Sequence, residues 1–292
     1  MNGFTGRAHE VAGRLILVLL LFGATAVPVA AEHVDQALLA RADSLAPRAL
    51  PALERRAARG DAEAAILLGE AHHRGRIVTR DDTAATEWFT RAAETGVPLA
   101  QYWLARKHDL GDAVGQDRHV AARWYRRAAE QGYANAQNRL GELYVRGLGV
   151  DQDYREALRW FERAAGQRHA GATANLAAMH YHGRGVDRDY QKAFELFHRA
   201  ALQGSEAALL ILGNMALHGL GTERSLVDAY RWYDLATQVH GEDPDDERTA
   251  GMAETMLERL GPHLTDGEIR EARAAAIRWS DDLGRAHHPR PR

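Results

Sequence analysis

The stretch "RWYRRAAEQG", from Arg123 to Gly132, decides the fold because the chain repeats it at a fixed interval. Thirty-six residues later the sequence reads "RWFERAAGQR", from Arg159 to Arg168. Positions that recur every 36 residues form columns, and four columns each hold one kind of residue. The first is mostly tryptophan (Trp88, Trp124, Trp160, Leu196, Trp232) and the second is alanine (Ala85, Ala121, Ala157, Ala193, Ala229). The third is glycine (Gly75, Gly111, Gly147, Gly183, Gly219) and the fourth holds small residues (Gly69, Ala105, Gly141, Ala177, Gly213). Five units of 36 residues therefore cover residues 61–240 without an insertion, which indicates a repeat architecture.

Each unit reads as two helices joined by a glycine turn. In the third unit, Ala136, Leu140 and Leu143 recur at helical spacing along one face. Gly147 is placed to end that helix, because glycine readily adopts the left-handed conformation found at helix C-termini. The second helix is predicted to begin at an aspartate N-cap, a column held by Asp81, Asp117, Asp153 and Asp189.

The repeated phrase also predicts how the helices pack. Trp124 is expected to fill the gap between two helix layers, and Ala128 and Ala129 are small where a neighbouring helix crosses at about 8–10 Å between axes. A single helix pair cannot bury its apolar face alone, so each unit needs neighbours. The predicted fold is therefore all-α: a right-handed α/α superhelical solenoid of five 36-residue helix-turn-helix repeats with capping helices.

Residues 1–31 read as a secretory signal peptide. Arginines precede the apolar run "LILVLLLF" (Leu15–Phe22), and small residues follow it. The alternative is an uncleaved membrane anchor, but the 17 residues from Leu15 to Ala31 are fewer than the roughly 20 that span a bilayer. We expect an exported mature chain that starts near Glu32 and has no membrane association. The periplasm is the predicted compartment, and the extracellular space is the alternative.

The segments that flank the repeats are predicted to cap the array. Residues 32–60 read as a half-repeat, since Ala57 and Gly60 fall on repeat columns when shifted by 36. Residues 241–283 hold a predicted capping box (Thr265 and Glu268) and an apolar helical stripe (Ile269, Ala272, Ala276, Trp279). Residues 284–292 carry no packing pattern and are predicted to be a disordered tail.

Composition excludes several classes of function. The chain has 292 residues, of which 46% are hydrophobic, so it can bury a sizeable core. Its formal charge of −3 argues against a nucleic-acid partner, which selects for a basic surface. The absence of cysteine excludes disulfides, thiolate metal sites and a cysteine nucleophile.

Motifs that carry chemistry are missing from the sequence. No serine is followed three residues later by lysine, and Gly-x-Ser-x-Gly, phosphate-loop and His-Glu-x-x-His patterns do not occur. Asp151–Glu162 resembles a calcium loop only in part, because Arg155 replaces the ligand at the fifth position and Glu156 replaces the turn glycine at the sixth. His72, His108 and His180 share one column, but stacked helices lie about 10 Å apart, too far for a common zinc ion. We expect no catalytic residue, metal or cofactor.

At these columns the sequence resembles the Sel-one-like repeat family, which is related to tetratricopeptide repeats. The stretch "LGELYVRGLGVDQDYREALRWFERAA" (Leu140–Ala165) matches the family pattern almost position by position, and Leu264–Trp279 resembles the terminal helix of bacterial members. The resemblance implies an exported bacterial scaffold, adaptor or regulator that binds other proteins. Some cysteine-rich secreted members have been linked to penicillin binding or β-lactamase activity, which is not carried over to a chain without cysteine.

A partner-binding surface is predicted by aligning the small-residue column with the helix-packing glycine of tetratricopeptide repeats. The alignment places polar and aromatic residues of the first helices on the inner, concave face, where they suit a peptide or a partner helix. Trp103 stands out, because other units hold leucine, arginine, asparagine or isoleucine in its column. The predicted contact residues are Tyr102, Arg106, Asn135, Asn138, Glu142, Arg146, His182, Asn214 and His218.

Two functions remain open from the sequence. The first is an exported protein-binding scaffold or regulator, favoured by the full repeat array. The second is a hydrolase of cell-wall or β-lactam-like substrates, disfavoured because no catalytic group is found. The partner of the scaffold is predicted to be a protein or peptide and not a nucleic acid.

Overall fold

A computed structural model describes residues 41–238, apart from 43 and 113, together with residues 244–287. The predicted signal peptide lies outside these residues. The described part of the chain contains thirteen α-helices, two short 3-10 helices and no strand, which confirms the all-α repeat fold. None of the described helices has the length and apolar character required to cross a membrane.

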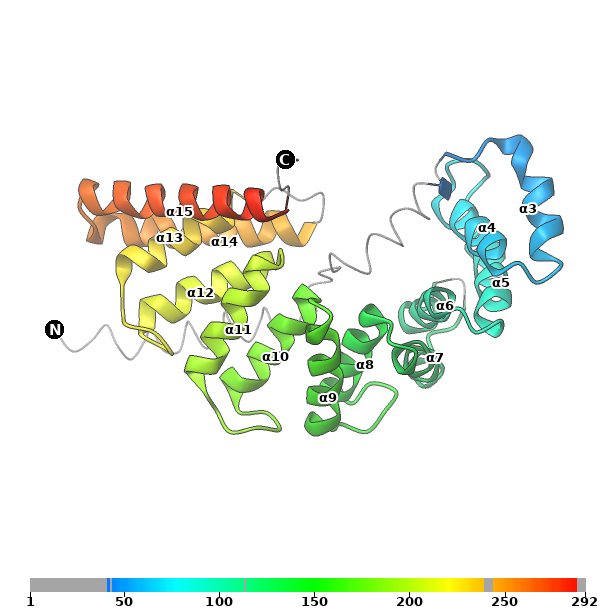
Figure 1. Cartoon of the computed structure of the whole chain (residues 1–292), viewed down its shortest axis with the longest axis horizontal. Helices are drawn as coiled ribbons and strands as arrows, with labels where there is room; N and C mark the ends of the chain where they lie inside the picture. The colour runs from blue at the N-terminus through cyan, green and yellow to red at the C-terminus, as the bar shows by residue number, and fades with distance from the viewer. Residues whose placement is uncertain (1–40, 43, 113, 239–243, 288–292) are drawn as a thin grey trace. The chain divides into compact units, whose positions relative to one another are not determined.

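The chain forms two compact units that divide between Ala172 and Thr173, within helix α10 (Ala170–His182). Successive helices in each unit alternate as the first and second helices of a repeat (Figure 1). The unit before the division contains η1 (Pro47–Ala49), α3 (Leu50–Ala57), α4 (Ala62–Arg74), α5 (Asp82–Glu94), α6 (Pro98–Leu110), α7 (Arg118–Glu130), α8 (Ala134–Arg146) and α9 (Tyr154–Gly166). The unit after it contains α11 (Tyr190–Leu202), α12 (Glu206–His218), α13 (Leu226–Thr237), α14 (Pro244–Leu260), η2 (Gly261–His263) and α15 (Asp266–His287).

The core of a repeat is an aromatic ring seated on a glycine. A Cβ atom added to Gly141 of α8 would lie 2.6 Å from Cε1 of Phe161 in α9, and one added to Gly213 of α12 would lie 2.6 Å from Cε1 of Tyr233 in α13. The small-residue column thus lets the two helices of one repeat approach closely. The residue after each tryptophan column position fills this space and is almost completely buried: Phe89, Tyr125, Phe161, Phe197 and Tyr233.

This arrangement corrects the predicted role of Trp124. Tyr125 is fully buried between the helices, whereas Trp124 is only partly buried. The Arg127 guanidinium lies over the indole ring at 4.5 Å from its centroid and covers it. The sequence pattern identified the correct helix but assigned the central packing position to its neighbour, because a helix places adjacent residues about 100° apart.

Aspartate N-caps begin the second helices, as predicted. Asp81, Asp117, Asp153 and Asp189 each accept a hydrogen bond from a backbone N–H in the first turn of α5, α7, α9 and α11. Ser225 has the same role at α13, where its Oγ accepts from the Asp228 N–H. The cap column thus fixes where each second helix starts.

Glycine is required at the turns of the repeat. Gly147 ends α8 with φ 65°, in the left-handed region. Gly149 is more restricted: with φ 68°, a Cβ atom there would lie 2.0 Å from the backbone oxygen of Arg118 at the start of α7. At the next turn, Arg168 has φ 65° in a column where Gly60, Gly96, Gly132 and Gly204 also have positive φ.

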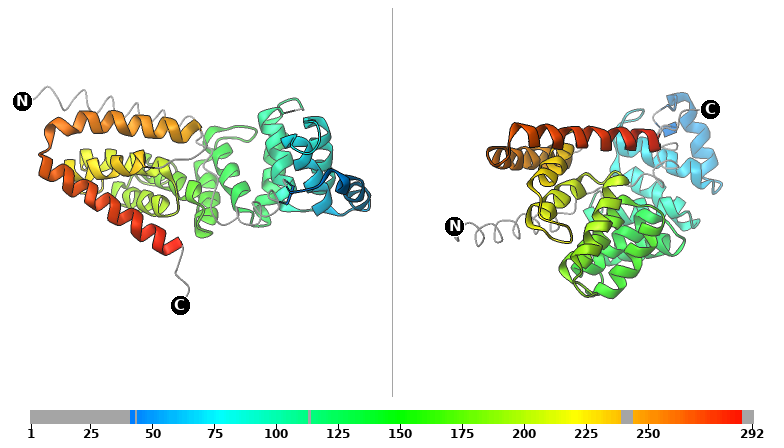
Figure 2. Two further views of the ribbon diagram at one scale, coloured as in Figure 1. Left: turned by 90° about the horizontal axis from the view of Figure 1, so that it is seen from above. Right: turned by 60° about the vertical axis from the view of Figure 1, so that its left-hand side comes forward.

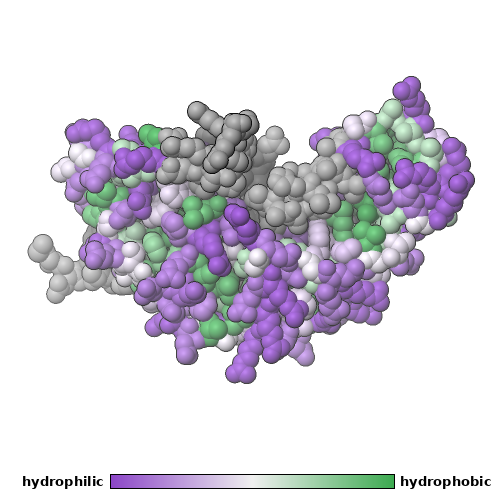
Figure 3. Space-filling view, viewed as in Figure 1, coloured by the Kyte–Doolittle hydropathy of each residue, from purple (hydrophilic) through white to green (hydrophobic). Residues whose placement is uncertain are grey.

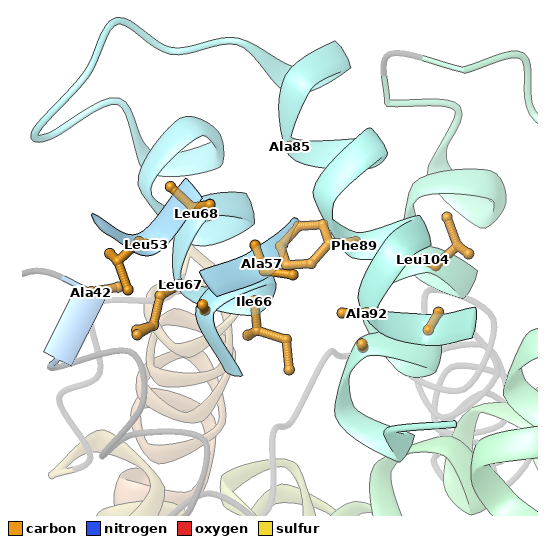
Figure 4. Packing of buried hydrophobic residues seen from close by; sticks show 14 residues of the cluster. Ala42, Leu53, Ala57, Ile66, Leu67, Leu68, Ala85, Phe89, Ala92 and Leu104 are labelled. Atoms are coloured by element: carbon orange, nitrogen blue, oxygen red, sulfur yellow. The ribbon is translucent and has the colours of Figure 1, made fainter. Parts of the chain in front are cut away.

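Helix α3 packs against the first complete repeat through apolar contacts. Leu53 and Ala57 of α3 are buried with Leu67 and Leu68 of α4 and with Phe89 of α5 (Figure 4). Because α3 contributes one apolar face, it shields the first complete repeat from solvent.

At the C-terminal end, α14 and α15 both pack against α13 (Figure 2). Trp232 of α13 and Trp279 of α15 meet edge to face with ring centroids 5.8 Å apart. The predicted capping box is present: Glu268 accepts from the Thr265 N–H at 2.7 Å, and Thr265 Oγ1 accepts from the Glu268 N–H at 3.3 Å. Helix α15 runs to His287, beyond the predicted start of the tail at residue 284, since no proline interrupts it before Pro289.

Candidate partner-binding surface

The nine predicted contact residues divide between the two units. Tyr102, Arg106, Asn135, Asn138, Glu142 and Arg146 lie on α6 and α8, whereas His182, Asn214 and His218 lie on α10 and α12. On the side shown in Figure 3, hydrophilic side chains cover most of the described surface, with small apolar areas between them.

Arg106 of α6 is held by an aromatic stack. Trp103 lies parallel to Phe89 of α5, with ring centroids 6.0 Å apart, and the Arg106 guanidinium lies over Trp103 at 4.8 Å. Glu70 of α4 is 1% exposed, and burial raises the pKa of its carboxyl against the opposing effect of Arg74, His73 and Arg106. The unusual Trp103 therefore orients a cation beside a buried acid.

On α8, the Glu142 carboxylate is held by two donors from the same helix. Asn138 Nδ2 donates to Glu142 Oε1 at 2.7 Å, and the Arg139 guanidinium donates to Oε2 at 2.8 Å. The nearby carboxylate raises the pKa of Arg139, which stays charged. Arg146, one turn beyond, is exposed at the end of the helix. Helix α8 thus carries an oriented Glu142 carboxylate and an exposed, positively charged Arg146 guanidinium.

Four of the nine predicted contact residues are more deeply buried than residues on an exposed binding surface would be. Tyr102, Asn135, Asn138 and Asn214 are at most 8% exposed. Tyr102 meets Tyr133 edge to face at 5.3 Å, and Tyr233 donates to Asn214 Oδ1 at 3.0 Å. The columns of Tyr102, Asn138 and Asn214 face the packed interior in several repeats, and Asn138 and Asn214 are hydrogen-bonded there to Glu142 and Tyr233. Partner binding by the nine residues stays a prediction.

The histidines of the second group lie at helix C-termini. His182 is half-buried, and burial together with Arg184 lowers the pKa of its imidazole to about 4. His218 ends α12 and is half-buried as well. Within the described residues, no group of three or more His, Cys, Asp or Glu side chains is arranged to hold a metal ion.

A buried lysine was missed by the sequence reasoning. Lys107 of α6 is 3% exposed, and its Nζ lies 2.7 Å from Asp82 Oδ1 and 2.9 Å from His73 Nδ1. The pKa of Asp82 is strongly lowered, first by the hydrogen bond from Lys107 and then by those from His73 and Arg80. This cluster joins α4, α5 and α6. A signal was present in the sequence, because the equivalent column positions are Ala71, Leu143, Met179 and Met215.

A second missed residue is His169, which caps α10 as a neutral base. Its Nδ1 accepts from the Ala172 N–H at 3.0 Å, and its side chain is 2% exposed. Burial lowers the pKa of the imidazole to about 3. Capping requires the lone pair of the neutral imidazole, and that lone pair is already used by the Ala172 N–H. We therefore assign His169 to the stability of the fold and not to partner binding.

The helix pairs of each unit stack as in a helical-repeat protein of the α/α solenoid class. The chain belongs to the Sel1 repeat family, whose model matches residues 62–97, 98–133, 134–169, 170–205 and 207–238. Sel1 repeat proteins generally mediate protein–protein interactions and are generally non-catalytic. The family predicted from the repeat columns is therefore confirmed.

Solved structures support the same fold. A Sel1 repeat protein from Oxalobacter formigenes is 27% identical, with a TM-score of 0.62, and the match covers 74% of this chain and 96% of that one. A protective antigen of uropathogenic Escherichia coli with an SLR fold is 24% identical, with a TM-score of 0.51, over 84% of this chain and 60% of that one. No curated protein matches this chain.

Proposed function

We propose that this protein is an exported, periplasmic scaffold or regulatory adaptor that holds a partner protein or peptide on the first helices of its repeats. The observation that carries the proposal is the set of oriented charges on α6 and α8. Arg106 is fixed on Trp103, and Glu142 is fixed by Asn138 and Arg139. Side chains that are already ordered lose little conformational entropy when a partner binds.

The buried Asn138 amide positions one charge of this surface. Asn138 is buried and cannot provide a large accessible contact, yet it orients the more exposed Glu142. We therefore assign direct partner contacts to Arg106, Glu142 and Arg146, and a positioning role to Asn138. Export is supported by the signal-peptide pattern of residues 1–31.

Site-specific photocrosslinking tests the proposal. A photoreactive amino acid replaces exposed Arg146 on α8 and, as a matched control, exposed Arg259 on α14. We expect Arg146 to give a discrete adduct in periplasmic extract that Arg259 does not give. Adding Arg106→Ala should reduce the adduct at least tenfold, whereas Arg270→Ala should leave it unchanged. The same adducts from both positions, or from Arg259 alone, would contradict the proposed surface.

A further inference from the structure

A basic face lies on the second helices α7 and α9, which the proposed function does not use. The two helices together contain seven arginines and three glutamates, although the whole chain has a formal charge of −3. One glutamate, Glu156, pairs with Arg159 at 2.5 Å, which leaves Glu130 and Glu162 as the remaining acids on these helices. The local charge is therefore opposite to that of the chain.

The exposed arginines are ordered by tryptophan rings. The Arg127 guanidinium lies 4.5 Å from the Trp124 centroid, and that of Arg163 lies 4.6 Å from the Trp160 centroid. Both arginines are exposed, and neither has an ion pair among the described residues. Stacking uses the face of a guanidinium and leaves N–H donors on its edge, in the geometry that binds a carboxylate through two hydrogen bonds.

Hydrogen bonds at both ends keep α9 alongside α7. Gln167, which follows α9, donates to the backbone oxygen of Gly132, which follows α7, at 2.9 Å. At the opposite ends, His119 Nδ1 lies 3.0 Å from the backbone oxygen of Gly149. Neighbouring helices have axes on the order of 10 Å apart, and three residues of a polyproline II segment rise about 9 Å and bring every third side chain to the same side. Carboxylates three residues apart in that conformation therefore match arginines on neighbouring repeats.

We propose that the α7–α9 face, centred on Arg127 and Arg163, binds an acidic peptide segment in the polyproline II conformation, with carboxylates spaced by three residues. Arg123 precedes Trp124 and adds positive charge to the same face, whereas Arg159 is paired with Glu156. The adjacent second helix α5 repeats the stacked pair of Trp88 and Arg91 but carries three acidic residues against this single arginine. The basic face therefore ends at α7, and its short length fits a peptide better than a long anionic polymer.

Fluorescence anisotropy with synthetic peptides tests the proposal on the full mature chain. The probe is a labelled peptide of four Glu-Ser-Gly triplets, and its comparison has the same composition with the four glutamates in one block. We expect the spaced peptide to bind at least ten times more tightly than the blocked one. Arg127→Ala with Arg163→Ala should weaken binding at least tenfold, whereas Arg259→Ala with Arg270→Ala, which removes equal charge from α14 and α15, should change it less than twofold.

A lysine variant distinguishes the contribution of the stacked guanidinium geometry to binding from the contribution of its positive charge. Arg127→Lys with Arg163→Lys keeps both charges but loses the planar stacked donors, so we expect intermediate binding. Circular dichroism confirms that each variant is folded. Undetectable binding, equal binding by the alanine variant, or binding of inorganic polyphosphate in place of the spaced peptide would each overturn the proposal.

Discussion

Replacing Gly141 with alanine tests whether the glycine–aromatic contact controls the packing of a repeat. The added Cβ atom would lie 2.6 Å from Phe161 Cε1, and other atoms of the same ring lie within 3.0 Å. Phe161 is 1% exposed, so its ring has little room to move. Overpacking in a core costs about 1–3 kcal/mol.

Gly251→Ala is the matched control. Gly251 lies in α14, is exposed, and has no atom within 4 Å of the position of an added Cβ. Alanine is favoured over glycine in a helix by about 1 kcal/mol, and this gain applies to both sites. The difference between the two variants therefore isolates the packing contribution. We expect Gly251→Ala to be stabilised by up to about 1 kcal/mol and Gly141→Ala to be less stable than it by about 1–3 kcal/mol.

Urea denaturation followed by circular dichroism measures this difference, and hydrogen exchange of the α8 amides reports it locally, since repeat arrays can open in parts. In a Phe161→Leu background the ring is absent, so Gly141→Ala should lose its penalty. A coupling energy of about 1–2 kcal/mol between the two positions is expected. Equal stabilities for Gly141→Ala and Gly251→Ala, or no coupling with Phe161, would refute the reasoning.

Four further predictions follow from single positions. Arg168→Gly should stabilise the chain by about 0.5–1 kcal/mol, because relief of the left-handed conformation exceeds the added backbone entropy; a lower urea midpoint would contradict this. Burial holds the pKa of His169 at about 3 in the folded chain, so the stability that its neutral ring contributes is present above pH 6.5 and falls by about 2 kcal/mol at pH 5. His169→Asn can still cap α10, so this variant should lose about 2 kcal/mol less stability than the native chain between pH 8 and pH 5. An unchanged pH dependence would refute this assignment. Lys107→Met should cost about 2–3 kcal/mol by leaving Asp82 with fewer partners, and adding Asp82→Asn should restore most of it; no recovery in the double variant would show that the pair is not the cause. Intact-mass measurement of periplasmic protein should give a chain that starts near Glu32, and retention of the N-terminal apolar run would indicate an anchor instead.

The sequence predicted the helices well because the repeat supplies five independent readings of each position. Apolar columns, Asp153 and its equivalents, and Gly147 depend on local backbone rules that act in every unit. The same columns were less informative about depth within the structure. Trp124 and Tyr125 are adjacent and both aromatic, and only the packed structure, as where Gly141 of α8 meets Phe161 of α9, shows that the second ring of each unit fills the space between its two helices.

The candidate surface was harder to predict, because a polar residue can be exposed or internally satisfied. Asn138 reads as a surface amide in the sequence, yet it is buried and holds Glu142. Lys107 reads as an ordinary surface cation, yet it is buried with Asp82. Comparison along a column resolves such cases, since Asn138 and Lys107 occupy positions that are mostly apolar in the other repeats.

Residues that differ between units at one column make the contacts that distinguish one repeat of this chain from another. A residue shared by all five units serves the packing that every repeat needs. A residue that departs from its column in one unit, such as Lys107, or that lies in a column that varies from unit to unit, such as Trp103 and Arg139, makes a contact that only its own unit makes. These three lie on α6 and α8, where they orient Arg106, anchor Asp82 and hold Glu142. These unit-specific contacts orient the charges of α6 and α8 on which the proposed partner surface rests.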